Sequence, residues 1–79
     1  DDLEIFIYPN PSNAIFEISC KNTSIQKINI YNNLGQLIIN KSGRNLNKHE
    51  ISLEDNNPGL YYISIETLKE TQVFKIIKH

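Results

Sequence analysis

The sequence predicts an all-β fold, an Ig-like antiparallel β-sandwich of about seven strands with Greek-key connections. Apolar and polar residues alternate with a period of two in run after run, and no stretch has a convincing helical period. Segments rich in Asn, Gly and Pro separate these runs at intervals of about 8–12 residues. A parallel sheet would need crossover helices, for which a chain of 79 residues with this many strands has no room.

The alternation places each strand in turn. The predicted strands are Leu3–Tyr8, Phe16–Lys21, Lys27–Tyr31, Leu37–Ile39, Glu50–Glu54, Tyr61–Glu66 and Val73–Ile77. In the fourth strand Ile38 breaks the pattern between two other apolar residues. The seventh strand has apolar residues on both faces, so we expect one of its faces to stay uncovered.

Composition excludes several classes of function. The net charge of −1 gives no reason to expect binding to nucleic acid or to an anionic membrane. Cys20 is the only cysteine, so no intrachain disulfide can form. Cys20 lies on the same face of its predicted strand as Phe16 and Ile18, which predicts that it is buried. The length predicts a single domain over residues 1–79, in which residues 1–3 belong either to the domain or to the end of a preceding linker. The absence of an initiator Met suggests a segment of a longer protein.

No arrangement of residues predicts catalysis, a cofactor or a metal ion. A Ser–His–Asp set, a carboxylate pair and a phosphate-binding Gly loop are all missing. His49 is expected at a strand edge, and together with His79 it lacks a third ligand at a recognisable spacing. The oxygen-rich segment 55–57 (Asp-Asn-Asn) favours a solvated turn over a calcium site.

The segment YPNPSN, residues 8–13, ends the first strand. Pro9 and Pro11 each remove a backbone donor, so the segment cannot pair on both edges. Residues 10–13 fit a type I turn that begins with Asn10, and Asn13 is the residue best able to adopt a positive φ. A crossover between the two sheets is favoured over a ligand site.

Two glycines are expected in turns that need positive φ. Gly35, followed by Gln36, would turn the hairpin between the third and fourth strands, and Gly59 would lead into the sixth. Tyr61, just after Gly59, resembles the tyrosine corner of Greek-key sandwiches, whose hydroxyl bonds the backbone a few residues upstream.

Four stretches taken together resemble one family. They are residues 8–16 (YPNPSNAIF), 30–37 (IYNNLGQL), 58–65 (PGLYYISI) and 75–78 (KIIK). Their order and spacing resemble the type A C-terminal sorting domain of type IX secretion cargo proteins in Bacteroidota, from Ile5 to Lys78. Two positions depart from the family pattern: Ala14 stands where a Gly is usual, and His79 follows the usual lysine-rich end.

The resemblance implies a non-catalytic address carried by an upstream cargo protein. It implies recognition in the periplasm by the type IX machinery, comprising an outer-membrane translocon, a shuttle protein and a sortase, followed by passage to the cell surface or the medium. It also implies that the sortase removes the domain, with cleavage at or before Asp1 and Asp2.

The last strand and its adjacent loops form the predicted recognition surface. A terminal strand with a free edge permits β-augmentation by a receptor, and it also permits a strand-edge dimer. Lys75 and Lys78 would either guard this edge against aggregation or meet an acidic partner. The residues assigned to the surface are Lys75, Ile76, Ile77, Lys78, Gly59 and Tyr61, and those assigned to structural motifs are Pro9, Asn10, Pro11, Asn13, Gly35 and Gln36.

The alternative function is an accessory adhesion or carbohydrate-binding module similar to fibronectin type III domains. Such modules usually have a buried Trp, and this chain has none. Carbohydrate binding favours a row of exposed aromatic side chains, so finding Phe6, Tyr31 and Tyr62 together on one face would favour this alternative.

Overall fold

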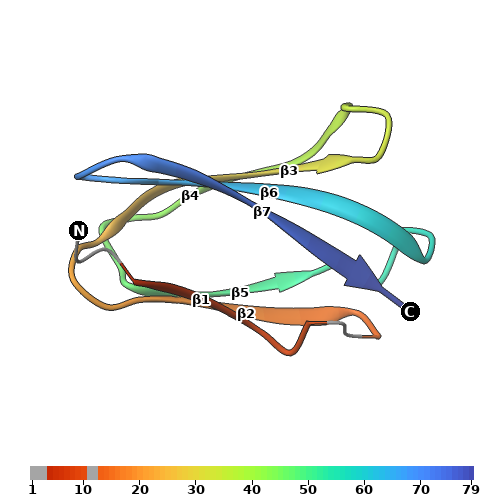
Figure 1. Ribbon diagram of the computed structural model, residues 1–79, viewed down its shortest axis with the longest axis horizontal. Helices are drawn as coiled ribbons and strands as arrows, with labels where there is room; N and C mark the ends of the chain where they lie inside the picture. The colour runs from red at the N-terminus through yellow and green to blue at the C-terminus, as the bar shows by residue number, and fades with distance from the viewer. Residues whose placement is uncertain (1–3, 11–12) are drawn as a thin grey trace.

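Two antiparallel sheets pack face to face, as Figure 1 shows. The computed structural model describes residues 4–10 and 13–79, and in this part of the chain it has seven strands and no helix. The strands are β1 (Ile5–Tyr8), β2 (Ile15–Cys20), β3 (Ile25–Asn32), β4 (Leu37–Ser42), β5 (Lys48–Ser52), β6 (Gly59–Thr67) and β7 (Thr71–Lys78). The predicted all-β sandwich is confirmed.

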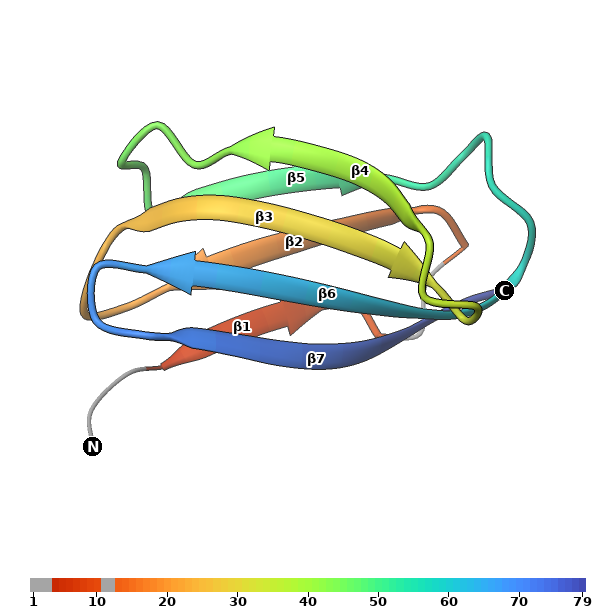
Figure 2. The same ribbon diagram turned by 90° about the horizontal axis from the view of Figure 1, so that it is seen from above.

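The strand order is β1-β2-β5 in one sheet and β4-β3-β6-β7 in the other. Consecutive strands therefore change sheet three times, after β2, β4 and β5. Strands β1 and β7 are edge strands on the same side of the sandwich, and β4 and β5 are edge strands on the other side (Figure 2). No helix long and apolar enough to cross a membrane is found among the described residues.

Alternation places the apolar side chains between the sheets. β2, β3 and β6 each direct every second residue inward, and most of these residues have almost no exposed surface. On β7, Ile76 is fully buried, whereas the inward-facing Phe74 is only partly buried. The fully or nearly buried set is Phe16, Ile18, Cys20, Ile25, Ile28, Ile30, Ile51, Leu53, Tyr61, Ile63, Ile65 and Ile76. Cys20 is buried as its parity predicts.

A β-bulge explains why Ile38 breaks the alternation of the fourth strand. Tyr31 pairs with Leu37 and Ile30 pairs with Ile39, so Ile38 is an extra residue on β4. Both Ile38 and Ile39 consequently pack against the core. The irregular sequence pattern corresponds to an irregular ladder.

Side chains close the turn between β3 and β4. Asn32 accepts hydrogen bonds from the backbone N–H groups of Leu34 and Gln36, both at 2.9 Å, and its amide donates to Oε1 of Gln36 at 2.7 Å. Gly35 has a φ of +84°, as expected for this turn. Gln36 thus has a structural role in the hairpin.

The connection from β4 to β5 contains a glycine that is needed for space. Gly43 is buried, and its N–H donates to the carbonyl of Gln26 at 2.9 Å. A Cβ atom at this position would overlap the backbone carbonyl group of Ile25. The positive φ values of the turn are taken instead by Arg44 and Asn45.

The YPNPSN segment leaves β1 through a cis peptide bond between Tyr8 and Pro9. It leads from β1 to β2, which pairs with β1 in the same sheet, so the predicted crossover between the two sheets is wrong. The predicted type I turn includes Pro11, which lies outside the described residues. Asn13 is exposed, and Ala14 is not among the described residues with a positive φ. Ala14 therefore replaces the usual Gly of the family pattern without left-handed strain.

Candidate recognition surface

β7 presents an uncovered face, as its two-sided apolar sequence predicts. Phe74 and Ile76 point toward the core, whereas Val73 and Ile77 point outward and are 65% and 43% exposed. Ile76, which the sequence analysis assigned to the recognition surface, is a buried core residue. Lys75 lies between Val73 and Ile77 on the same outer face and is also exposed. This face therefore combines two apolar side chains with one cation.

Lys75 has no acidic neighbour in its row of the sheet. The row runs from Lys75 to Tyr62, Tyr31 and Leu37, which are paired across β7, β6, β3 and β4. Lys21 and Glu4 form an ion pair at 3.6 Å, but Lys75 forms no ion pair within the described part of the chain. Its charge is left to solvent or to a partner.

Lys78 is placed differently from the sequence expectation, which treated it with Lys75 as a surface charge. The residue is only 8% exposed, because it shares the parity of Phe74 and Ile76 and points inward. Its ammonium donates to the carbonyl of Leu53 at 2.7 Å and to that of Asn56. The side chain therefore ties β7 to the segment after β5, and its charge is not on the outer face.

Asn10, from the YPNPSN segment, is attached to the backbone of β7. Its amide nitrogen donates to the carbonyl of Lys75 at 3.1 Å, and its Oδ1 accepts from the N–H of Ile77 at 3.1 Å. A neighbouring strand would satisfy the same two backbone groups. Asn10 thus explains what this loop does for the fold: it covers part of the outer edge of β7 with a side chain.

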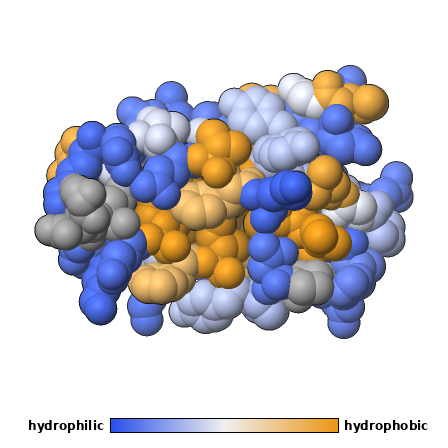
Figure 3. Space-filling model, in the orientation of Figure 1, coloured by the Kyte–Doolittle hydropathy of each residue, from blue (hydrophilic) through white to orange (hydrophobic). Residues whose placement is uncertain are grey.

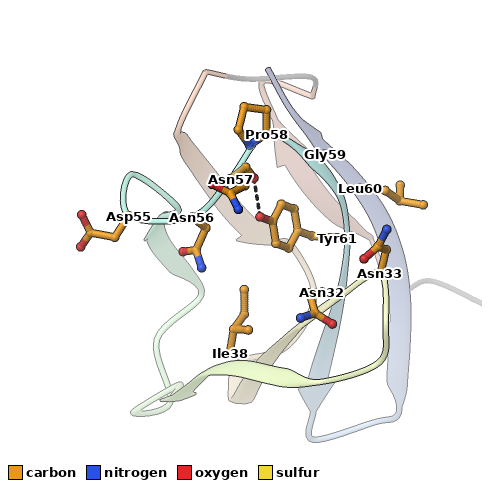
Figure 4. Close-up of a pocket in the computed structure, with 10 residues that line it drawn as sticks. All are labelled: Asn32, Asn33, Ile38, Asp55, Asn56, Asn57, Pro58, Gly59, Leu60 and Tyr61. Atoms are coloured by element: carbon orange, nitrogen blue, oxygen red, sulfur yellow. Dashed lines mark hydrogen bonds between the residues drawn. The ribbon is translucent and has the colours of Figure 1, made fainter.

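Ten residues line a polar pocket of about 290 Å³ (Figure 4), and the loops that contribute to it are at the same end of the sandwich as the C-terminus (Figure 1). The pocket lies between the β3–β4 turn and the segment that leads from β5 to β6. The lining residues include Gly59, whose φ is +148° as the predicted turn requires, and Tyr61. Tyr61 is buried, and its hydroxyl donates to the carbonyl of Asn57, which is the hydrogen bond predicted for a tyrosine corner.

The Tyr61→Phe substitution should destabilise the domain by about 1.5 kcal/mol, because it removes the donor and leaves the Asn57 carbonyl without this partner. Urea unfolding followed by circular dichroism measures the difference. Tyr62→Phe is the control, since Tyr62 lies one residue away on the exposed face and should change stability little. Equal midpoints for the two variants would contradict a structural role for the Tyr61 hydroxyl.

The remaining polar candidates do not form a metal site in the described part of the chain. No three His, Cys, Asp or Glu side chains there lie close enough to hold a metal ion. Asp55 and Asn57 are exposed in the turn before β6. His49 lies on the edge strand β5, as expected, with Nε2 2.8 Å from the carbonyl oxygen of Gly43.

The aromatic residues that would favour carbohydrate binding do not lie on one face. Tyr31 and Tyr62 are cross-strand neighbours on the outer face of the four-stranded sheet. Phe6 is on β1, where Ile5 and Ile7 pack against the core, so its ring is on the outer face of the other sheet. The arrangement that would favour the adhesion or carbohydrate-binding alternative is therefore not present.

The fold and this surface define a class of protein: a small Ig-like sandwich whose last strand is displayed at an open edge and is linked to the first loop. The chain belongs to the family of secretion system C-terminal sorting domains, whose pattern matches residues 6–79. These domains are the sorting signals of type IX secretion and are themselves non-catalytic. Proteins that carry them reach the cell surface or are secreted.

A curated relative is the ulvan lyase NLR42 of Nonlabens ulvanivorans. The two sequences are 32% identical over 69 residues, which is 87% of this chain and 13% of the lyase. The chain thus spans only a small part of a protein that is named for an enzymatic activity.

Proposed function

We propose that this chain directs an upstream cargo protein through the type IX pathway by presenting the outer face of β7 to the export machinery. The machinery would recognise the domain in the periplasm, a shuttle protein and an outer-membrane translocon would carry the cargo across, and a surface sortase would then remove the domain. Cleavage would occur at or before Asp1 and Asp2. The observation that supports this proposal best is the family match over residues 6–79.

Within the domain, Lys75 is the charge that we propose the machinery recognises. It is exposed between Val73 and Ile77, and no ion pair within the described residues neutralises it. Lys78 is proposed as a structural residue, because its ammonium is bonded to two backbone carbonyls. Gly59 and Tyr61 are proposed to contribute by shaping the loop beside the end of β7.

A reporter fusion in a type IX-competent host tests this proposal. The domain is attached to the C-terminus of a periplasmic reporter, and reporter activity is measured on the cell surface and in the medium. We expect export of the unmodified fusion and at least a fivefold loss for Lys75→Glu, because charge reversal would repel an acidic partner. Retention of the unmodified fusion in the periplasm would overturn the sorting role.

The matched control is Lys48→Glu, a charge reversal on the exposed strand β5 of the other sheet. It changes the net charge equally and should leave export unchanged. Equal export of the Lys75 and Lys48 variants would overturn the role of Lys75 alone. Deletion of residues 75–79 is a poorer test, because it also removes the buried side chains of Ile76 and Lys78 from the fold.

A further inference from the structure

The two sides of the sandwich differ in the chemistry of the side chains that line them. On the side of β4 and β5, the ammonium of Lys41 reaches across from β4 and donates to the carbonyl of Glu50 on β5 at 3.0 Å. On the side of β1 and β7, hydrophobic side chains gather at the surface (Figure 3). Here Ile5, Ile7 and Phe74 are only half-buried. This side is therefore an apolar strip bounded by two edge strands.

The backbone of β7 has groups available on this side. The bonds from Asn10 to Lys75 and Ile77 show that these two residues direct their N–H and C=O groups toward the free edge. Alternation along the strand gives Val73 the same orientation. Asn10 engages one carbonyl and one N–H. None of the described strands pairs with this edge of β7, so the other outward backbone groups of these three residues are available to an added strand.

The side chains at this edge specify the chemistry of an added strand. Its inner face would cover the half-buried Phe74 and must be apolar. Its outer face would lie beside Val73, Lys75 and Ile77, a pattern with a cation between two apolar side chains. Because Lys75 has no acidic partner in its own row, a carboxylate opposite it gives the complementary pair.

A second copy of β7 fits this edge less well. In antiparallel pairing centred on Lys75, the apolar Val73 and Ile77 would face each other correctly, but Lys75 would lie directly opposite Lys75. Like charges directly opposite in a sheet are destabilising. The same lysine thus disfavours self-pairing in this register and favours an acidic partner.

We propose that the edge of β7 binds an extended partner strand with a carboxylate opposite Lys75, and that Asn10 occupies part of this edge until that strand displaces it. This inference rests on the proposed function, since it names the chemistry by which the sorting surface would be recognised. The strand is largely apolar and carries one acidic residue on its outer face. Asn10 is a positioning residue that competes for the same backbone groups.

Two synthetic peptides test the preference for charge. The basic peptide has the sequence of residues 71–78 with blocked ends. The acidic peptide is identical except for the change Lys75→Glu, so the two differ only in the central charge. Fluorescence anisotropy measures their affinity for the domain. We expect the acidic peptide to bind the unmodified domain about tenfold more tightly than the basic one. The order should reverse for the domain variant Lys75→Glu and stay unchanged for Lys48→Glu.

Variants of Asn10 test the competition. Asn10→Ala frees both backbone groups and should tighten binding of the acidic peptide about fivefold. Asn10→Asp keeps the acceptor for Ile77 but loses the donor to Lys75, so its effect should be intermediate. Amide NMR should show the peptide-induced shifts at Val73, Lys75 and Ile77. Unchanged affinity in both variants would overturn the role of Asn10.

Equal binding of the two peptides, or binding of neither, would overturn the proposed partner chemistry. This result would leave the sorting function standing if the reporter is still exported. Conversely, failed export of the unmodified fusion together with the expected peptide preference would overturn the proposed function alone.

Discussion

Lys78→Glu is expected to destabilise the domain strongly, whereas Lys75→Glu should leave its stability almost unchanged. The ammonium of Lys78 is surrounded by the carbonyls of Leu53 and Asn56 in a region with little exposed surface. A carboxylate there would face two acceptors and be buried without a donor, which costs more than about 3 kcal/mol. That is a large share of the roughly 5 kcal/mol of stability at the low end for small domains.

Urea unfolding followed by circular dichroism distinguishes the two lysine variants. Lys78→Met provides an intermediate case, because it keeps much of the aliphatic stem and removes only the donor. We expect it to cost about 2 kcal/mol. If Lys78→Glu unfolded at the same urea concentration as Lys75→Glu, the inward placement of Lys78 would be wrong.

Gly43→Ala should be the second most damaging single change. The new methyl group would overlap the carbonyl group of Ile25, which is backbone at the start of β3 and cannot rotate away. Overpacking of this kind costs about 3 kcal/mol, because the two segments must separate. Loss of the bond from Gly43 N–H to the Gln26 carbonyl would follow.

Gly35→Ala is the matched control for this prediction. Gly35 has a positive φ, but a Cβ there meets nothing within 4 Å. The control should therefore cost only about 1 kcal/mol, from the left-handed backbone alone. Thermal unfolding of the two variants side by side measures the difference, and a larger loss for Gly35→Ala would contradict the steric explanation.

Local patterns predicted the strands and most of their inward faces, because alternation is a property of neighbouring residues. Even the irregularity at Ile38 had a structural meaning, since it marks the bulge between β3 and β4. Turn chemistry likewise predicted the positive φ at Gly35 and Gly59 and the hydrogen bond of Tyr61. These features depend on residues at most a few positions apart.

The sequence prediction was less successful where the residue type and the position in the strand gave different expectations about burial, or where the contacts were distant in the sequence. Lys78 shares the parity of Ile76, so the alternation itself pointed inward, but lysine is almost never fully buried and was expected at the surface. The role of Asn10 could not be predicted locally, because its partners are 65 and 67 residues away. In the turn that contains Gly43, the glycine was needed for close approach of two segments and not for its backbone angle.

The position of β7 has a consequence for quality control. This strand is the last of the seven to be synthesised, yet it supplies Ile76 to the core and Lys78 to the segment after β5. A chain that is truncated or clipped before these residues cannot complete the sandwich. An assembled sandwich therefore reports that translation has continued through β7 and that no cleavage has removed this strand.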